Sequence, residues 1–132
     1  MDTLDQQIDT FLAAPAFAVF GASDDPTKWG TKVYKCYLRH NKVAYPVNPR
    51  VETIDGNTVY KNLAALPEKV ESISIITPPP ITEKIMEDAI AAGVKNVWMQ
   101  PGAESHKAVQ RGEESGLNVI WGGPCLLVVM GY

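Results

Sequence analysis

Apolar positions follow two spacings along this chain, one typical of helices and one typical of buried strands. Helical spacing predicts helices over about residues 3–13, 30–40, 81–92 and 104–115. Short apolar runs predict strands over residues 16–21, 42–47, 72–77, 95–99 and 117–121. Strands that alternate with helices in this way are typical of a parallel sheet with helices on both faces. The pattern therefore predicts an α/β three-layer fold with a mostly parallel sheet.

The segments between these elements are short. Residues 51–60 surround an Asp55-Gly56-Asn57 turn and form at most small edge strands, and residues 63–66 could form one helical turn. Gly93 is expected to cap the helix over 81–92. The inward positions expected for that helix are Ile81, Ile85, Met86 and Ile90. The apolar tail, residues 125–129, is expected to pack on the sheet.

Composition narrows the class of protein. The 132 residues are 45% apolar and 20% charged, which suits one domain over residues 1–132 with one core. The net charge of −3 argues against a general nucleic-acid binder, so a site for a polyanion must be a local basic patch. The two cysteines, Cys36 and Cys125, are far apart in sequence and lack metal-ligand spacing. We expect buried free thiols and a reducing compartment.

The chain shows no targeting pattern. No apolar stretch approaches the roughly 20 residues of a transmembrane helix. The first basic residue is Lys28, and Asp2, Asp5 and Asp9 precede it, which disfavours a secretory signal and a mitochondrial transit peptide. A cytoplasmic location is the expectation, with neither membrane nor nucleic acid as a partner.

Candidate ligand-binding residues are sought directly after the predicted strands, because ligands of open parallel sheets bind beyond the carboxyl ends of the strands. The residues that follow the five predicted strands, in chain order, are Gly21, Ala22, Ser23 and Lys28; Asn48, Pro49 and Arg50; Thr77, Pro78 and Pro79; Gln100, Pro101 and Gly102; and Gly122, Gly123 and Pro124. Glycine permits close backbone approach and proline sets rigid turns, so these ends are suited to ligand contact.

The first two strand ends favour a phosphate-bearing ligand. Gly21-Ala22-Ser23, with a helix beginning near Gly30, is typical of a first βα turn that receives phosphate. It is longer and looser than the Gly-x-Gly-x-x-Gly dinucleotide fingerprint. After the second strand stands Arg50, where an NAD site has an acidic residue. An arginine suits an extra ribose phosphate, which both NADP and coenzyme A (CoA) carry.

Several short motifs together resemble one family. They are Val19-Phe20-Gly21-Ala22-Ser23, then Pro26, Lys28 and Gly30, Tyr45-Pro46-Val47-Asn48-Pro49, Thr77-Pro78-Pro79, Val97-Trp98-Met99-Gln100-Pro101-Gly102 and Cys125. In order and spacing they resemble the CoA-binding domain family, which includes the amino-terminal domain of the succinyl-CoA synthetase α subunit and small stand-alone proteins. The resemblance covers nearly the whole chain and is strongest to the stand-alone branch.

The resemblance implies a Rossmann-like fold that holds CoA across the strand ends. It places Gly21, Ala22 and Ser23 at the phosphates, and Lys28 and Arg50 near the negatively charged end of the ligand. It places Asn48 and Pro49 beside the adenosine, and Thr77, Pro78 and Pro79 along the pantetheine path. The chain departs from the family in two places, with Thr77 where an arginine is common and Gly122-Gly123-Pro124 before Cys125.

Catalytic patterns are weak in this sequence. Neither His40 nor His106 has a carboxylate at a spacing that would orient an imidazole. Ser23 does not fit a nucleophile elbow, because Asp25 stands where Gly-x-Ser-x-Gly needs its last glycine. Trp29, Trp98 and Trp121 are expected at or near strand ends and are interpreted as packing residues, with adenine stacking as the alternative for Trp29.

The sequence thus predicts a small cytoplasmic CoA- or acyl-CoA-binding protein, a binding module rather than an enzyme. Two alternatives stay open. One is an NADP-binding oxidoreductase-like protein. The other is a regulator that senses the thiol state of CoA through Cys125. A protein partner or a homo-oligomer is also possible. No metal site and no catalytic residues are predicted.

Overall fold

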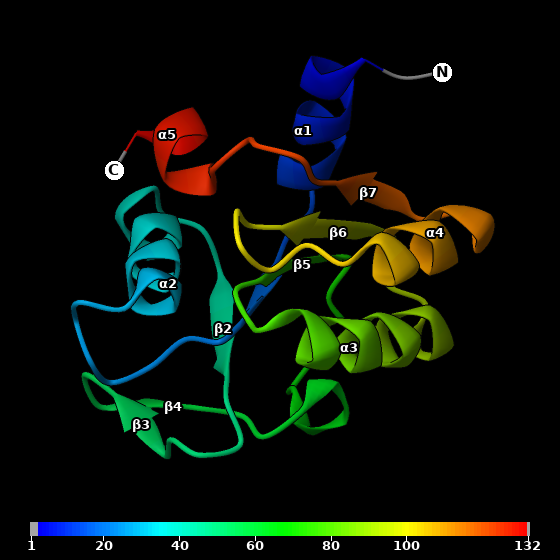
Figure 1. The fold of residues 1–132 in the computed structure, drawn as a ribbon. Helices are drawn as coiled ribbons and strands as arrows, with labels where there is room; N and C mark the ends of the chain where they lie inside the picture. The colour runs from blue at the N-terminus through cyan, green and yellow to red at the C-terminus, as the bar shows by residue number, and fades with distance from the viewer. Residues whose placement is uncertain (1–2, 132) are drawn as a thin grey trace.

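A five-stranded sheet forms the centre of the computed structural model, which describes residues 3–131 (Figure 1). Its strands are β1 (Phe17–Phe20), β2 (Ala44–Val47), β5 (Ser72–Ile75), β6 (Asn96–Met99) and β7 (Asn118–Ile120). Their order is β2-β1-β5-β6-β7, and every neighbouring pair is parallel. The predicted α/β, Rossmann-like three-layer fold is confirmed.

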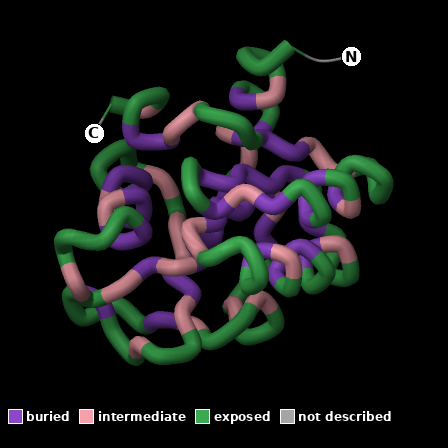
Figure 2. The backbone as a smooth tube through the Cα atoms, viewed as in Figure 1, coloured by how far each residue is buried: buried purple, intermediate pink, exposed green. Residues whose placement is uncertain are grey.

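Helices cover both faces of this sheet. On one face lie α1 (Leu4–Leu12), α2 (Trp29–Arg39) and α5 (Leu126–Met130), and on the other lie α3 (Pro79–Ala92) and α4 (His106–Glu114) (Figure 1). Successive strand residues point to opposite faces, so Phe17 of β1 stacks on Tyr37 of α2 while Phe20 joins the core beneath α3. The three central strands, β1, β5 and β6, are accordingly buried throughout (Figure 2).

The path of the chain creates a switch point between β1 and β5. From β1 it passes through α2 to β2 on one side. It then returns through a small antiparallel hairpin, β3 (Thr53–Ile54) and β4 (Asn57–Thr58), and the 3-10 turn η1 (Leu63–Ala65) to β5 on the other side of β1. Loops diverge where the strand order reverses, and ligands of such sheets bind there, beyond the carboxyl ends.

The structure corrects four details of the predicted pattern. Helix α3 begins at Pro79 rather than at residue 81, because proline suits the first turn of a helix, where its missing N–H has no partner to lose. Its Ile81 is 49% exposed rather than inward. Trp98 lies inside β6 and is fully buried, not at a strand end. The apolar tail packs in the core against the sheet as expected, but it does so as a further helix, α5, which also contacts α2.

The cap of α3 and the burial of Cys36 agree with expectation, whereas Cys125 is less buried than expected. Gly93 caps α3 with φ of +79°, a left-handed conformation that favours glycine. Cys36 is a buried free thiol, while Cys125 is free but only half-buried. Within residues 3–131, no helix is long and apolar enough to cross a membrane.

Candidate functional site

Backbone hydrogen bonds align the ends of four neighbouring strands. The N–H of Gly21 donates to the Val47 carbonyl (3.1 Å), and the N–H of Ile76 donates to the Phe20 carbonyl (2.8 Å). The N–H of Gln100 then donates to the Ile75 carbonyl (3.0 Å). The loops after β2, β1, β5 and β6 therefore leave the sheet side by side. This arrangement brings most of the predicted site residues to one edge.

Two glycines let the loop after β1 pass very close to its neighbours. Gly21 has φ of +99°, and a Cβ there would lie 2.1 Å from the Ile76 carbonyl oxygen. A Cβ on Gly30 would lie 2.1 Å from the Gly21 carbonyl oxygen and 3.0 Å from the Ala22 nitrogen. Neither position has room for a side chain. The start of α2 is thus pressed directly against the Gly21–Ala22 turn.

Buried side chains fix the shape of this turn. Thr31, on the first turn of α2 and 1% exposed, shares its hydroxyl proton between the carbonyl oxygens of Ser23 (2.7 Å) and Asp25 (2.8 Å). The same oxygen accepts from the Ser23 N–H (3.2 Å). From β2, the Asn48 side chain donates to the Ala22 carbonyl (2.9 Å). We call residues 21–31, held in this way, the cradle loop.

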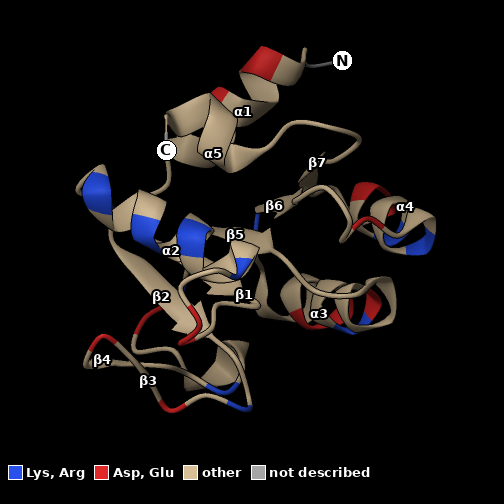
Figure 3. Cartoon of the chain, turned by 60° about the vertical axis from the view of Figure 1, so that its left-hand side comes forward, with Lys and Arg blue, Asp and Glu red and all other residues tan. Residues whose placement is uncertain are grey.

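The cradle loop ends in the first residues of α2. In the part of the chain that the structure describes, no side chain caps the backbone N–H donors at this helix terminus. Its N-cap residue, Lys28, makes no capping hydrogen bond in the described structure, so the first helical N–H groups can attract an anion. Within its bounds α2 carries Lys32, Lys35 and Arg39 and no acidic residue (Figure 3). Lys35 is paired with Asp55 (3.1 Å), and Arg39 is the last residue of α2. The basic residues nearest the glycine turn are therefore Lys28 and Lys32.

One carboxylate of the cradle loop is already engaged. The Asp25 side chain accepts from the Thr27 hydroxyl (2.7 Å) and from the Thr27 N–H (2.9 Å). These hydrogen bonds, with smaller help from Lys28, hold the pKa of Asp25 below its ordinary value. The carboxylate is satisfied by Thr27 and does not compete for the donors of α2.

Asn48, Pro49 and Arg50 form the next loop along the edge. The Asn48 side chain accepts from the Arg50 N–H (2.9 Å) while it donates to Ala22, so it joins this loop to the cradle loop. Arg50 is exposed, and its side chain has no hydrogen bond or ion pair within residues 3–131. Its guanidinium is available to a ligand.

Thr77, Pro78 and Pro79 follow β5 and open α3. The Thr77 hydroxyl is 2.9 Å from the hydroxyl of Thr82, so it is tied back to α3. Pro79 and Pro80 occupy the first positions of α3 and have no N–H. The start of α3 is therefore apolar and poor in donors, in contrast to the start of α2. Charged ligand groups should favour α2, and apolar groups should favour α3.

A chamber of about 290 Å³ opens beside these loops, between α2, the ends of β5 and β6, and α5. Its lining residues are Trp29, Val33, Ile76, Gln100, Pro101, Cys125 and Leu127. We call it the strand-end chamber. Trp29 is 62% exposed and carries the Lys32 ammonium 4.7 Å above its ring. Trp29 therefore lies in the wall of the strand-end chamber and not at the Asn48–Arg50 loop.

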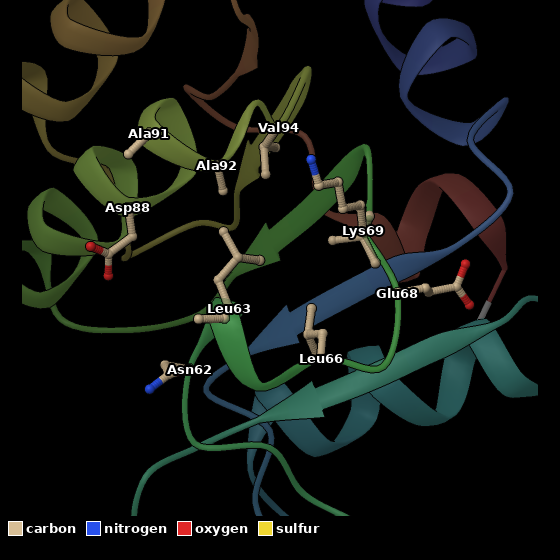
Figure 4. Close-up of a pocket in the computed structure, with 11 residues that line it drawn as sticks. Asn62, Leu63, Leu66, Glu68, Lys69, Asp88, Ala91, Ala92 and Val94 are labelled. Carbon is tan, nitrogen blue, oxygen red and sulfur yellow. The ribbon is translucent and has the colours of Figure 1, made fainter.

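A larger cavity, about 730 Å³, lies at the opposite edge of the sheet (Figure 4). It is bounded by η1, by the segment before β5 and by the carboxyl end of α3, with Leu63, Lys69, Asp88 and Val94 among its walls. No predicted site residue lines it. Parallel sheets bind their ligands at the carboxyl edge, so we assign the site to the cradle loop and its neighbours despite the greater volume here.

Comparison with known proteins identifies the family. Residues 15–131 match the CoA binding domain family, and the chain belongs to it. The α subunit of an ADP-forming acetate–CoA ligase II from Pyrococcus furiosus is 35% identical over 92 residues, which are 68% of this chain and 20% of that protein. The chain spans about a fifth or less of the curated relatives it matches.

Solved structures agree with this assignment. A hypothetical protein from Pyrococcus horikoshii OT3 superposes with a TM-score of 0.88 at 28% identity, covering 96% of this chain and 89% of that one. A conserved hypothetical protein from Pyrococcus furiosus gives a TM-score of 0.80 at 33% identity, covering 86% of this chain and 97% of that one. The fold is thus shared with chains of similar length.

Proposed function

We propose that this chain is a CoA- or acyl-CoA-binding module whose ligand lies across the carboxyl edge of the sheet. The observation that carries the proposal is the contact of Gly30 with the Gly21–Ala22 turn. That contact brings the uncapped start of α2 onto a loop that also carries Lys28. A helix amino terminus and a lysine at a glycine turn are suited to phosphate. Membership of the CoA binding domain family supports CoA as the source of that phosphate.

Each part of the ligand has a proposed place. The backbone of Gly21, Ala22 and Ser23, together with Lys28, would bind the diphosphate. Arg50 would bind the ribose 3′-phosphate through charge-assisted hydrogen bonds. Asn48 and Pro49 would flank the adenosine. The donor-poor surface of Thr77, Pro78 and Pro79 would guide the pantetheine arm toward the strand-end chamber.

Calorimetric titration of the full chain with CoA and, separately, with NADP tests this proposal. We expect CoA to bind and NADP to bind at least tenfold more weakly, because the cradle loop lacks the second and third glycines of a dinucleotide turn. Dephospho-CoA is the control for the 3′-phosphate and should bind more weakly than CoA. Tight NADP binding without heat from CoA would contradict the proposal.

The proposal covers binding by a single domain. The Pyrococcus furiosus relative is about five times longer than the segment that matches this chain. The ligase reaction in its name is therefore no part of this proposal. A cytoplasmic location and the existence of a protein partner or homo-oligomer stay predictions from the sequence.

A second function, thiol sensing, is favoured by the position of Cys125. It is half-buried and lines the strand-end chamber, where the pantetheine thiol would arrive. With CoA disulfide as the oxidant, the Cys125 thiolate would attack one sulfur. A Cys125–CoA disulfide would form, the S–S bond of the reagent would break, and CoA thiolate would leave.

Intact-mass analysis after incubation with CoA disulfide checks this reaction. We expect one CoA adduct on the wild type and none on Cys125→Ser. Cys36 serves as the internal comparison, because burial raises the pKa of its thiol and it is 1% exposed. An unmodified chain, or an adduct that persists in Cys125→Ser, would argue against sensing through Cys125.

A further inference from the structure

The strand-end chamber contains a buried polar group that the fold leaves unsatisfied. Gln100 follows β6 and is 3% exposed. Its Oε1 accepts the N–H of Leu126 (2.9 Å), and this backbone donor fixes which side-chain atom is the oxygen. Its Nε2 is buried and has no partner among the described residues. A buried donor without an acceptor destabilises a fold, and a bound ligand that supplies an acceptor would remove that cost.

The remaining walls of the chamber are mostly apolar. Val33 comes from α2, Ile76 from the end of β5, and Leu127 from α5. Pro101 and the Trp29 ring complete the apolar lining, and no lysine, arginine or histidine lines the chamber. The ligand that matches such walls is an uncharged apolar group that carries one hydrogen-bond acceptor.

The strand-end chamber lies at the same edge of the sheet as the proposed CoA site. Gln100 and Ile76 each follow a strand at the same edge as the cradle loop, and Trp29 adjoins Gly30 in α2. The thiol of free CoA would bring only a weak acceptor for the Gln100 donor and no acyl carbons to fill the space. A thioester brings both, because its carbonyl oxygen accepts a hydrogen bond and its acyl chain is apolar.

We propose that the strand-end chamber is an acyl pocket that makes this chain selective for CoA thioesters of short, uncharged acyl groups. The inference rests on the proposed CoA site. Gln100 Nε2 donates to the thioester carbonyl, and the acyl chain lies between Val33 and Leu127. A volume of about 290 Å³ corresponds to about ten water-sized groups, at about 30 Å³ each. After the thioester sulfur and oxygen, that space accepts up to about eight acyl carbons but not a long fatty chain.

Charge sets a second limit on the acyl group. A free carboxylate, as on a succinyl group, would enter a chamber without a basic side chain. Burying an unpaired charge in apolar surroundings is strongly unfavourable. Butyryl-CoA and succinyl-CoA have acyl groups of equal carbon number, so they form a matched pair that separates apolar fit from size.

Calorimetric titration of the unmodified full chain with CoA, acetyl-CoA, butyryl-CoA, succinyl-CoA and palmitoyl-CoA tests the acyl pocket. Each buried methylene should strengthen binding about fourfold. Because butyryl has two more methylenes than acetyl, we expect butyryl-CoA to bind about sixteenfold more tightly than acetyl-CoA, with a larger difference still relative to CoA. Succinyl-CoA should gain nothing over CoA, and palmitoyl-CoA should bind less tightly than butyryl-CoA.

The outcomes separate the acyl pocket from the CoA site on which it rests. If CoA binds and butyryl-CoA is no tighter, the acyl pocket is overturned while the CoA site stands. If succinyl-CoA equals butyryl-CoA, the selectivity for uncharged groups is overturned. If none of the five ligands binds, the proposed function fails, and the acyl pocket fails with it.

A substitution tests the role of the Gln100 amide. Gln100→Glu keeps an oxygen for the Leu126 N–H but replaces the donor by an acceptor. We expect the ratio of butyryl-CoA to CoA affinity to fall about tenfold. An unchanged ratio in a folded variant would show that Nε2 does not contact the acyl group and would remove Gln100 from the pocket. The ligand series on the wild type decides the acyl pocket even if this variant does not fold.

Discussion

Replacing Gly30 by alanine is expected to abolish measurable CoA binding and to reduce the free energy of unfolding by about 3 kcal/mol. The added Cβ would lie 2.1 Å from the Gly21 carbonyl oxygen and 2.5 Å from the Gly21 carbonyl carbon. Both are backbone atoms of the cradle loop and cannot rotate away. Either α2 moves back from the turn, or the turn opens, and each change separates the helix amino terminus from the phosphate position.

The expected change in the free energy of unfolding has the opposite sign to the change that helix propensity predicts. In an unconstrained helix, alanine is more favourable than glycine by about 1 kcal/mol. Gly30 stands on the first turn of α2, so propensity alone predicts stabilisation. The prediction therefore isolates the close contact with Gly21 from the intrinsic preference of the backbone.

Gly112→Ala is the matched control, because Gly112 is a buried helical glycine away from the cradle loop. In α4, a Cβ on Gly112 would meet the Cγ2 of Val119 at 2.8 Å and the Cε and Sδ of Met86 at 2.9 and 3.0 Å. Methionine is flexible and can shift, but Val119 is β-branched and buried, so we expect a loss of unfolding free energy of about 1–3 kcal/mol, with CoA affinity unchanged.

Urea denaturation followed by intrinsic fluorescence measures the stability of both variants, and calorimetry with CoA measures binding. A Gly30→Ala chain that is as stable as the wild type and binds CoA with the same Kd would show that the contact at Gly30 is not needed. Equal losses of CoA binding in Gly30→Ala and Gly112→Ala would show a general effect of lost stability rather than a local one.

The elements that sequence could predict are those whose signal is local. The apolar run before Gly21 and the periodic spacing over α2 and α3 each depend on neighbouring residues, and the corresponding strand and helices are present. Helix α5 was missed because Leu126–Met130 is apolar throughout and has no polar face to reveal a period. The exposure of Ile81 depends on how α3 lies on the sheet, which no local pattern contains.

The residues of the candidate site likewise fall into those that local sequence can predict and those that depend on tertiary packing. Gly21, Asn48 and Thr77 could be found because they directly follow strands, and strand ends of a parallel sheet share one edge. The role of Thr31 depends on carbonyl groups six and eight residues earlier in the chain, and that of Gln100 on an N–H 26 residues later. Those partners are fixed by tertiary packing. Lys32 offered a signal, because it is a second basic residue close after Lys28, in the helix that follows the glycine turn.

Charge reversal at Arg50 is expected to weaken CoA binding more than tenfold and to leave stability nearly unchanged. Arg50 is exposed, and its side chain has no hydrogen bond or ion pair within residues 3–131, so Arg50→Glu breaks no contact of the fold. Its N–H, which donates to Asn48, belongs to the backbone and is retained. The loss should therefore arise from the ligand, through replacement of an attractive charge by a repulsive one at the 3′-phosphate.

The ligand and the salt concentration identify the source of this loss. Dephospho-CoA lacks the 3′-phosphate, so Arg50→Glu should weaken it much less than CoA. The effect on CoA should shrink as salt is raised from 50 to about 500 mM, because charges near the surface are screened over about 10 Å or less at and above 0.1 M. A loss that is equal for both ligands would place Arg50 near another part of the molecule.

Lys69→Glu is the matched control, and it also tests the choice between the two edges of the sheet. Lys69 is an exposed residue that lines the larger cavity at the opposite edge, and its substitution makes the same change in net charge (Figure 4). We expect CoA affinity to change less than twofold. If calorimetry shows the tenfold loss in Lys69→Glu and none in Arg50→Glu, the ligand binds in the cavity beside η1, and the contact between Gly30 and Gly21 serves packing alone.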